Sequence, residues 1–317
     1  MEVKRRGVRF LVGKLSSVSE QTRVEALCEL RLMTKHDSES RPLIAEAGAI
    51  PYLADTLYSS SPASQENAAA ILLNLSISSR ESLMATRGLL DAFSDVLRHH
   101  DSTSSASAVQ SSAATLHSLL MVDEYRPIIG SKRDIVYSLV DIIKKPNSHP
   151  RSIKDSLKAL FGIALYPLNR NTMIQLGAIP PLFTLVVKDG RFGIVEDATA
   201  VIAQIAGCED SEEAFGKVSG VRILVDVLDL ATGSSTRTKE NAVSALLNFV
   251  RYGGERVASD VRDVASGALD GIADVAENGS SKGKSKAVAL LKVLIHGGSA
   301  GNLWSVSRFD SSLNQAS

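Results

Sequence analysis

Apolar and polar residues follow a helical period along the chain, and the same arrangement recurs at intervals of 42 to 45 residues. The clearest copies are 66–76 and 240–250, which share Glu-Asn-Ala followed by Leu-Leu-Asn and an apolar residue. We take the Asn of Leu-Leu-Asn as the reference position of each copy. The reference positions are, in chain order, Glu29, Asn74, Ser118, Gly162, Gln204, Asn248 and Val293. This regular spacing predicts a repeat protein.

Each copy has two distinct faces when it is placed on an α-helix with about 100° per residue. Apolar side chains stand two positions before and one position after the reference position in all seven copies, as in Leu72 and Leu75 or Leu246 and Phe249. The reference position and the positions four, seven and eight before it fall on the opposite side and are polar, charged or small. The pattern therefore predicts one long amphipathic helix per repeat, with an apolar inner face and a variable outer face.

Two further helices are expected ahead of each long helix. A short helix precedes a turn such as Gly48-Ala49-Ile50-Pro51, in which Gly ends one helix and Pro begins the next. Comparable turns stand at Gly88, Gly177, Gly220 and Gly267, and residues 8–15 form an apolar turn that would cover the first edge. We therefore expect one continuous array at 1–298, with about seven units. Residues 299–317 form a polar tail with the composition of a disordered segment.

Composition narrows the class of protein. Thirty-five basic and 35 acidic residues give zero net charge, which disfavours nucleic-acid binding. No run of 18 apolar residues is present, so we expect no membrane insertion. Cys28 and Cys208 stand in distant repeats, which favours a reducing compartment, cytoplasmic or nuclear. We expect a monomer.

Catalytic motifs are missing from the sequence. There is no phosphate-binding loop, dinucleotide-binding glycine motif or nucleophile elbow. His99-His100-Asp101 could bind a metal ion, but the ligand spacing favours a solvated helix end. The sequence therefore predicts a protein that is not an enzyme and that has no cofactor and no metal site.

The three-helix unit with Gly-Ala-Ile-Pro and Leu-Leu-Asn-Leu-Ser resembles the armadillo repeat over residues 8–297. The resemblance implies an all-α, right-handed superhelical solenoid. The segments 35–51, 65–76 and 239–242 are similar to the armadillo (ARM) region of plant U-box proteins. In that family the U-box binds a ubiquitin-conjugating enzyme and the repeats recognise the substrate. No room for a U-box precedes residue 8, so the resemblance implies a recognition module in the ubiquitin pathway without ubiquitin transfer. The alternative is the ARM part of a U-box ubiquitin ligase whose U-box lies outside this sequence.

Importin-α, a nuclear-import cargo adaptor, is another armadillo protein with which the chain can be compared. Its groove uses a Trp four residues before the reference Asn. None of the seven copies has Trp there; Ala70, Lys158 and Ser244 are examples of what stands in its place. An import adaptor is therefore the less favoured alternative.

A concave groove lined by the long helices is the expected binding surface for a partner protein or an extended peptide. Its expected residues are Glu29, Asn67, Ala70, Asn74, Ser118, Lys158, Glu196, Gln204, Glu240, Asn241 and Asn248. Two sites are expected, one around Asn74 and a second around Asn248, because a carboxamide can both donate to and accept from a peptide backbone. Asn is a mediocre helix former, so its presence inside two long helices favours a binding role over an ordinary solvated surface.

Overall fold

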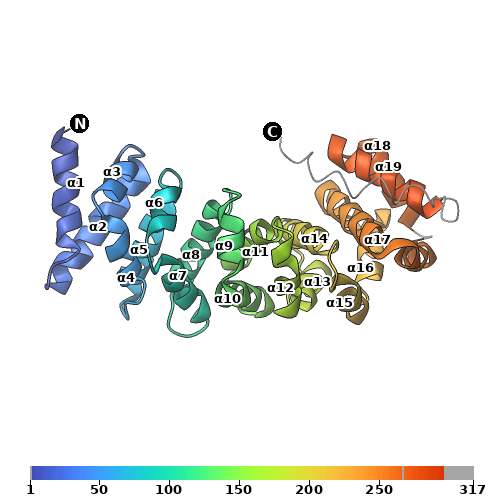
Figure 1. Ribbon diagram of the computed structural model, residues 1–317, viewed down its shortest axis with the longest axis horizontal. Helices are drawn as coiled ribbons and strands as arrows, with labels where there is room; N and C mark the ends of the chain where they lie inside the picture. Colours follow the sequence, from blue (N-terminus) through green and yellow to red (C-terminus); the bar gives the residue numbers. More distant parts are fainter. Residues whose placement is uncertain (1, 266–267, 296–317) are drawn as a thin grey trace. The chain divides into compact units, whose positions relative to one another are not determined.

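The computed structural model describes residues 2–265 and 268–295, which form helices and no strand within those ranges (Figure 1). The predicted all-α fold is confirmed. Two compact units divide the chain between Leu176 and Gly177, and we describe each by itself as unit one and unit two. The expected tail at 299–317 lies outside the described residues.

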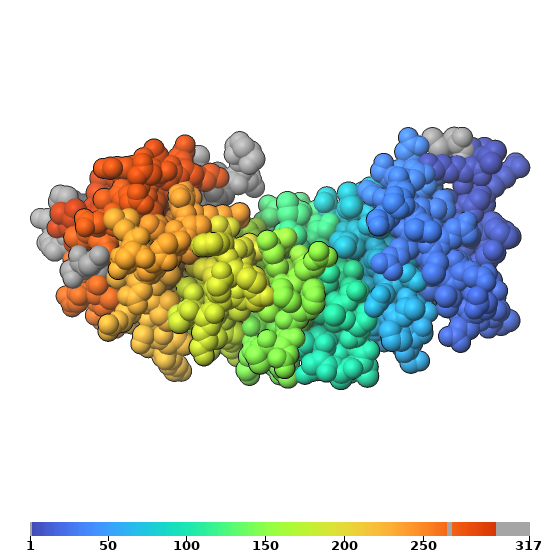
Figure 2. Space-filling model, turned by 180° about the vertical axis from the view of Figure 1, so that it is seen from behind, coloured from blue at the N-terminus to red at the C-terminus, as the bar shows by residue number. Residues whose placement is uncertain are grey.

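Unit one contains four long helices, each preceded by shorter ones. The long helices are α2 (Glu20–His36), α5 (Pro62–Leu75), α8 (Ala106–Leu119) and α11 (Pro150–Ala164). The shorter helices are α1 (Glu2–Lys14), α3 (Ser40–Glu46), α4 (Ala49–Thr56), α6 (Arg80–Ala85), α7 (Leu89–Arg98), α9 (Tyr125–Gly130), α10 (Arg133–Lys144) and α12 (Leu168–Gln175). The long helices pack in chain order, α2 on α5, α5 on α8 and α8 on α11, as the successive layers in Figure 2 also show.

Unit two continues the same alternation. Its long helices are α14 (Phe192–Ile205), the first part of α17 (Thr236–Ala265) and α19 (Ser281–Ile295), and each packs on the next. Its shorter elements are α13 (Ile179–Lys188), α15 (Ser211–Lys217), α16 (Gly220–Leu228), the 3₁₀ turn η1 (Leu230–Thr232) and α18 (Leu269–Asn278). Within each unit the repeats thus contact their neighbours in the chain, which is the organisation of a solenoid.

The apolar stripe predicted on each long helix is the core. The residue after the reference position is buried in all seven repeats, from Leu30 to Leu294. The residue two positions before it is buried in six, and the seventh, Leu291 of α19, is half-buried. Val288 of the same helix is exposed.

Left-handed residues form the turns between the two shorter helices of a repeat. Gly48, Gly88 and Gly177 have φ angles of 80°, 82° and 82°, which only glycine adopts without strain. The turn expected at Gly220 differs, since Ser219 has the positive φ, 53°. Gly220 instead lies where a Cβ atom would stand 2.8 Å from the Phe183 ring, so close packing explains this glycine.

Three long helices begin with a serine that is bound to the long helix of the preceding repeat. The Gln65 side chain of α5 accepts the Ser105 N–H (3.2 Å) at the start of α8. Glu196 of α14 accepts the Ser235 hydroxyl (2.7 Å) ahead of α17, and Glu240 of α17 accepts the Ser280 hydroxyl (2.9 Å) ahead of α19. Each serine hydroxyl also accepts the backbone N–H three residues later, as an N-cap does. These serines set the position of each helix start relative to its neighbour.

Helix α1 covers the first edge of unit one, as the apolar pattern at 8–15 predicts. Val8, Leu11 and Val12 are buried against α2 and α3. The Lys4 ammonium bonds to the Asp37 carboxylate (2.5 Å), and this bond, with that from the Ser40 hydroxyl, lowers the pKa of Asp37 to about 2.

In unit two, α17 contains both a long helix and the short helix that follows it. The break between them is at Gly254, with φ 68°.

Replacing a core leucine of a long helix tests this packing. Leu72→Ala in unit one and Leu246→Ala in unit two should each lower the free energy of unfolding by about 2–5 kcal/mol, because a cavity replaces fully buried methyl groups. Ile77→Ala is the control, since this exposed side chain should contribute less than about 0.5 kcal/mol. Urea unfolding followed by circular dichroism measures each value. Equal effects of Leu72→Ala and Ile77→Ala would contradict the assigned core.

Candidate partner-binding surface

The expected groove residues of unit one lie on the outer sides of α2, α5, α8 and α11. Glu29 is exposed, while Ala70, Asn74, Ser118 and Lys158 are half-buried. Asn67 is only 6% exposed. Each of the four long helices thus has one partly accessible side, and Asn67 lies beneath that surface.

Both asparagines of α5 bind the preceding long helix. The Asn67 oxygen accepts the Arg31 guanidinium N–H (2.8 Å), and its amide N–H lies 3.4 Å from the Cys28 sulfur. Asn74 donates to the Thr34 hydroxyl (3.1 Å). These carboxamides link α5 to α2, so part of their hydrogen-bonding capacity is used within the protein.

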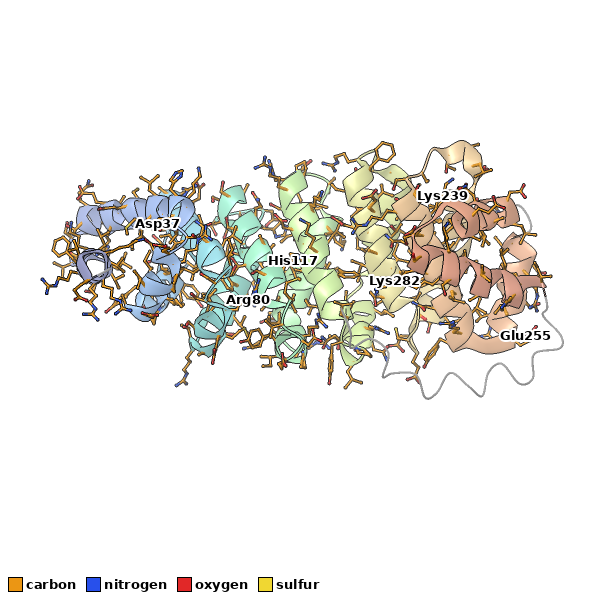
Figure 3. All side chains as sticks on the ribbon, turned by 90° about the horizontal axis from the view of Figure 1, so that it is seen from above. Asp37, Arg80, His117, Lys239, Glu255 and Lys282 are labelled. Atoms are coloured by element: carbon orange, nitrogen blue, oxygen red, sulfur yellow. The ribbon has the colours of Figure 1, made fainter. Side chains whose placement is uncertain are left out.

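The next two reference positions in unit one also make contacts between repeats. The Ser118 hydroxyl donates to the Ser76 carbonyl (3.1 Å) and accepts the Arg80 guanidinium N–H (3.3 Å). Arg80 belongs to α6, and His117 stands next to Ser118 on α8 (both labelled in Figure 3). At Gly162 a Cβ atom would stand 2.8 Å from Leu120, so only glycine allows α11 this close approach.

Unit two repeats the arrangement with α14 and α17. Asn241 donates to the Glu196 carbonyl (3.0 Å) and the Thr199 hydroxyl (3.2 Å), and Asn248 donates to the Ala203 carbonyl (2.9 Å). The carboxylates of Glu196 and Glu240 hold the serines that begin the next long helices. Glu196, Gln204, Glu240, Asn241 and Asn248 are all half-buried. Linking neighbouring helices is a role that sequence reasoning did not assign to Glu196, Glu240, Asn241 and Asn248.

An exposed aliphatic row in unit one was missed by the sequence reasoning. Leu32, Ile77 and Met121 each stand three positions after a reference position and are 58%, 54% and 60% exposed. Leu165 occupies the same position in the fourth repeat and is half-buried. The signal was present in the sequence as a fourth recurring apolar position. Leu32 lies within α2, whereas Ile77 and Met121 lie in the turns that follow α5 and α8.

Unit two has a different character at its last two long helices. Arg251 of α17 follows Asn248 by three positions, and Lys282 and Lys286 project from α19. The Lys286 ammonium donates to the Ser244 hydroxyl (3.0 Å), whose residue is 7% exposed. Desolvation, then the charges of Arg251 and Lys282, lower the pKa of Lys286, and Glu240 offsets this in part.

The remaining features of the structure concern metal ligands, a pocket and the length of apolar helices. No group of three His, Cys, Asp or Glu residues suited to a metal ion occurs in residues 2–265 and 268–295. A small pocket lined by Arg5, Arg9, Leu43, Glu46 and Ala47 lies away from the long-helix surface. Within the same ranges, no helix is long and apolar enough to cross a membrane.

Comparisons with known proteins agree with this architecture. The family model described as "Plant U-box protein ARM repeat region" matches residues 8–301. U-box domain-containing protein 16 of Arabidopsis thaliana is 32% identical over 290 residues, which cover 90% of this chain and 40% of that protein. The chain thus spans about two fifths of that relative's length.

Solved structures show the same fold. An engineered protein superimposes with a TM-score of 0.77 at 23% identity, over 92% of this chain and 69% of that one. The designed armadillo repeat protein YIII(Dq)4CqI gives a TM-score of 0.51 at 21% identity, over 90% of this chain and 99% of that one. At these identities the likeness concerns the fold alone, which is that of an armadillo repeat solenoid.

Two reference positions of unit two allow a matched test of the inter-repeat hydrogen bonds. Asn248→Ala should lower the free energy of unfolding of the unbound protein by about 1 kcal/mol, because the Ala203 carbonyl loses its donor. Gln204→Ala should change it by less than about 0.5 kcal/mol, since Gln204 makes no side-chain hydrogen bond within the described residues. Thermal and urea unfolding measure both variants, and equal stability of the two would argue against a linking role.

Proposed function

Because the chain belongs to the family of ARM repeat regions of plant U-box proteins, we propose that it is a protein-binding scaffold. The partner lies along the outer side of α2 and the turns that follow α5 and α8. The observation that carries the proposal is the row of Leu32, Ile77 and Met121 in unit one. Contiguous patches of exposed apolar side chains mark interaction sites. Removing such surface from water stabilises a complex with a partner.

The row has a defined spacing. Packed long helices are about 8–10 Å apart, so the turns that follow α5 and α8 and carry Ile77 and Met121 are expected to be about that far apart. A peptide in the polyproline II conformation rises about 9 Å every three residues and presents one side chain per turn to the same side. The partner segment is therefore an extended peptide with apolar side chains three residues apart. Burial of each aliphatic side chain of the row supplies about 1.5–3 kcal/mol.

The place in the ubiquitin pathway is proposed from the family. The curated relative is a U-box domain-containing protein, and the chain corresponds to a part of such a protein. We propose that the repeats supply recognition of a target and no catalysis, in the cytoplasm or nucleus. The alternative is that they do so as the ARM part of a complete U-box ligase. An import adaptor is disfavoured, since small and charged residues such as Ala70 and Lys158 replace the Trp that such a groove needs.

A peptide selected from a random library against the purified protein tests the binding surface. Ile77→Lys and Met121→Lys should each weaken its affinity at least tenfold, because a charge would be buried beneath an apolar side chain. Tyr137→Lys is the control, since Tyr137 is equally exposed, at 54%, but lies on α10. Fluorescence anisotropy measures the affinity, with circular dichroism as the check on folding. Unchanged affinity of both row variants, or a loss with Tyr137→Lys alone, would place the partner elsewhere.

A further inference from the structure

Three cations gather on unit two without an acidic partner. Arg251, Lys282 and Lys286 come from α17 and α19, and none forms an ion pair with a carboxylate in the described part of the chain. Glu240, whose negative charge acts on Lys286, bonds through its carboxylate to Ser280 ahead of α19. These positive charges are therefore only partly compensated.

Lys286 is held in an unfavourable place for a lysine. Its ammonium donates to the Ser244 hydroxyl (3.0 Å), and that hydroxyl donates onward to the Glu240 carbonyl (2.8 Å). A neutral hydroxyl is a weaker partner for an ammonium than a carboxylate is. Desolvation and the two neighbouring cations lower the pKa of Lys286, so a nearby anion would stabilise its ammonium.

The cluster lies on the side of the long helices that the proposed partner covers. Arg251 occupies the repeat position of Ile77 and Met121, three after the reference. Lys286 stands seven before Val293, the position that Asn241 has in the preceding repeat. The repeat position that carries an apolar side chain at Ile77 and Met121 thus carries a positive charge at Arg251.

We propose that Arg251, Lys282 and Lys286 bind an anionic group, a carboxylate or a phosphate, on an acidic segment of a partner protein. This inference rests on the proposed scaffold function and names the chemistry of a second contact. The guanidinium of Arg251 suits a bidentate contact with either anion, and the two ammonium groups add point charges. A protein segment fits better than a nucleic acid, because Glu196 and Glu240 lie on the same unit and the whole chain has zero net charge.

Peptide titration tests the proposal. The probes are three labelled dodecapeptides of equal length, one with a block of glutamates, one with phosphoserines and one with glutamines, measured by fluorescence anisotropy at low salt. The glutamate or the phosphoserine peptide should bind at least tenfold more tightly than the glutamine peptide, and added salt should weaken this binding. The stronger of the two identifies the source of the anion. Binding should also raise the pKa of Lys286, which NMR titration of the lysine side chains reports.

Charge-matched variants make the test specific. Arg251→Gln, Lys282→Gln and Lys286→Gln together should abolish the preference for the acidic peptides. The control, Lys144→Gln, Lys188→Gln and Arg222→Gln together, removes three exposed cations from α10, α13 and α16 and should leave it intact. Equal losses in both variants, no loss in the first, or tighter binding of single-stranded DNA than of either acidic peptide would overturn the proposal. If Ile77→Lys still weakens the library peptide in that case, the scaffold function stands and this inference alone fails.

Discussion

The burial of one face of every long helix against its neighbours is the interaction on which the structure depends. No repeat can cover Leu72 or Leu116 by itself, because the stripe on one long helix needs the stripes on both sides. On α19, the last long helix of the described residues, Leu291 is half-buried and Val288 exposed. At the other end α1 supplies the cover that a preceding repeat would give to α2.

The two units present different surfaces from the same scaffold. In unit one Leu32, Ile77 and Met121 are exposed three positions after the reference, whereas in unit two Arg251 has that position. The scaffold fixes the spacing of these positions, and the residue placed there sets the chemistry of the contact. The proposed apolar row and the proposed cationic cluster are therefore two uses of one repeat geometry.

The fold was predictable because the period of the core stripe is strong and repeated. Leu246 and Phe249 are buried as their positions imply, and Gly48 and Gly88 form the expected left-handed turns. The partners of the polar side chains were not predictable, since the 3.6-residue period says which side a residue occupies and not how far it reaches. Asn74 and Asn248 were expected to face a ligand, and their amides bond to the preceding helix. The cationic cluster also escaped notice, because Arg251 and Lys286 are 35 residues apart and meet only when α17 and α19 pack.

The serines at the starts of the long helices give the array a direction. Gln65, Glu196 and Glu240 each belong to one repeat and bind the serine at the start of the long helix in the repeat that follows. Melting of α17 would release Glu240 and leave α19 without this partner, whereas melting of α19 would leave the cap of α17 in place. Loss of structure should therefore spread more readily toward the C-terminus than toward the N-terminus. These contacts therefore couple the repeats in one direction along the chain.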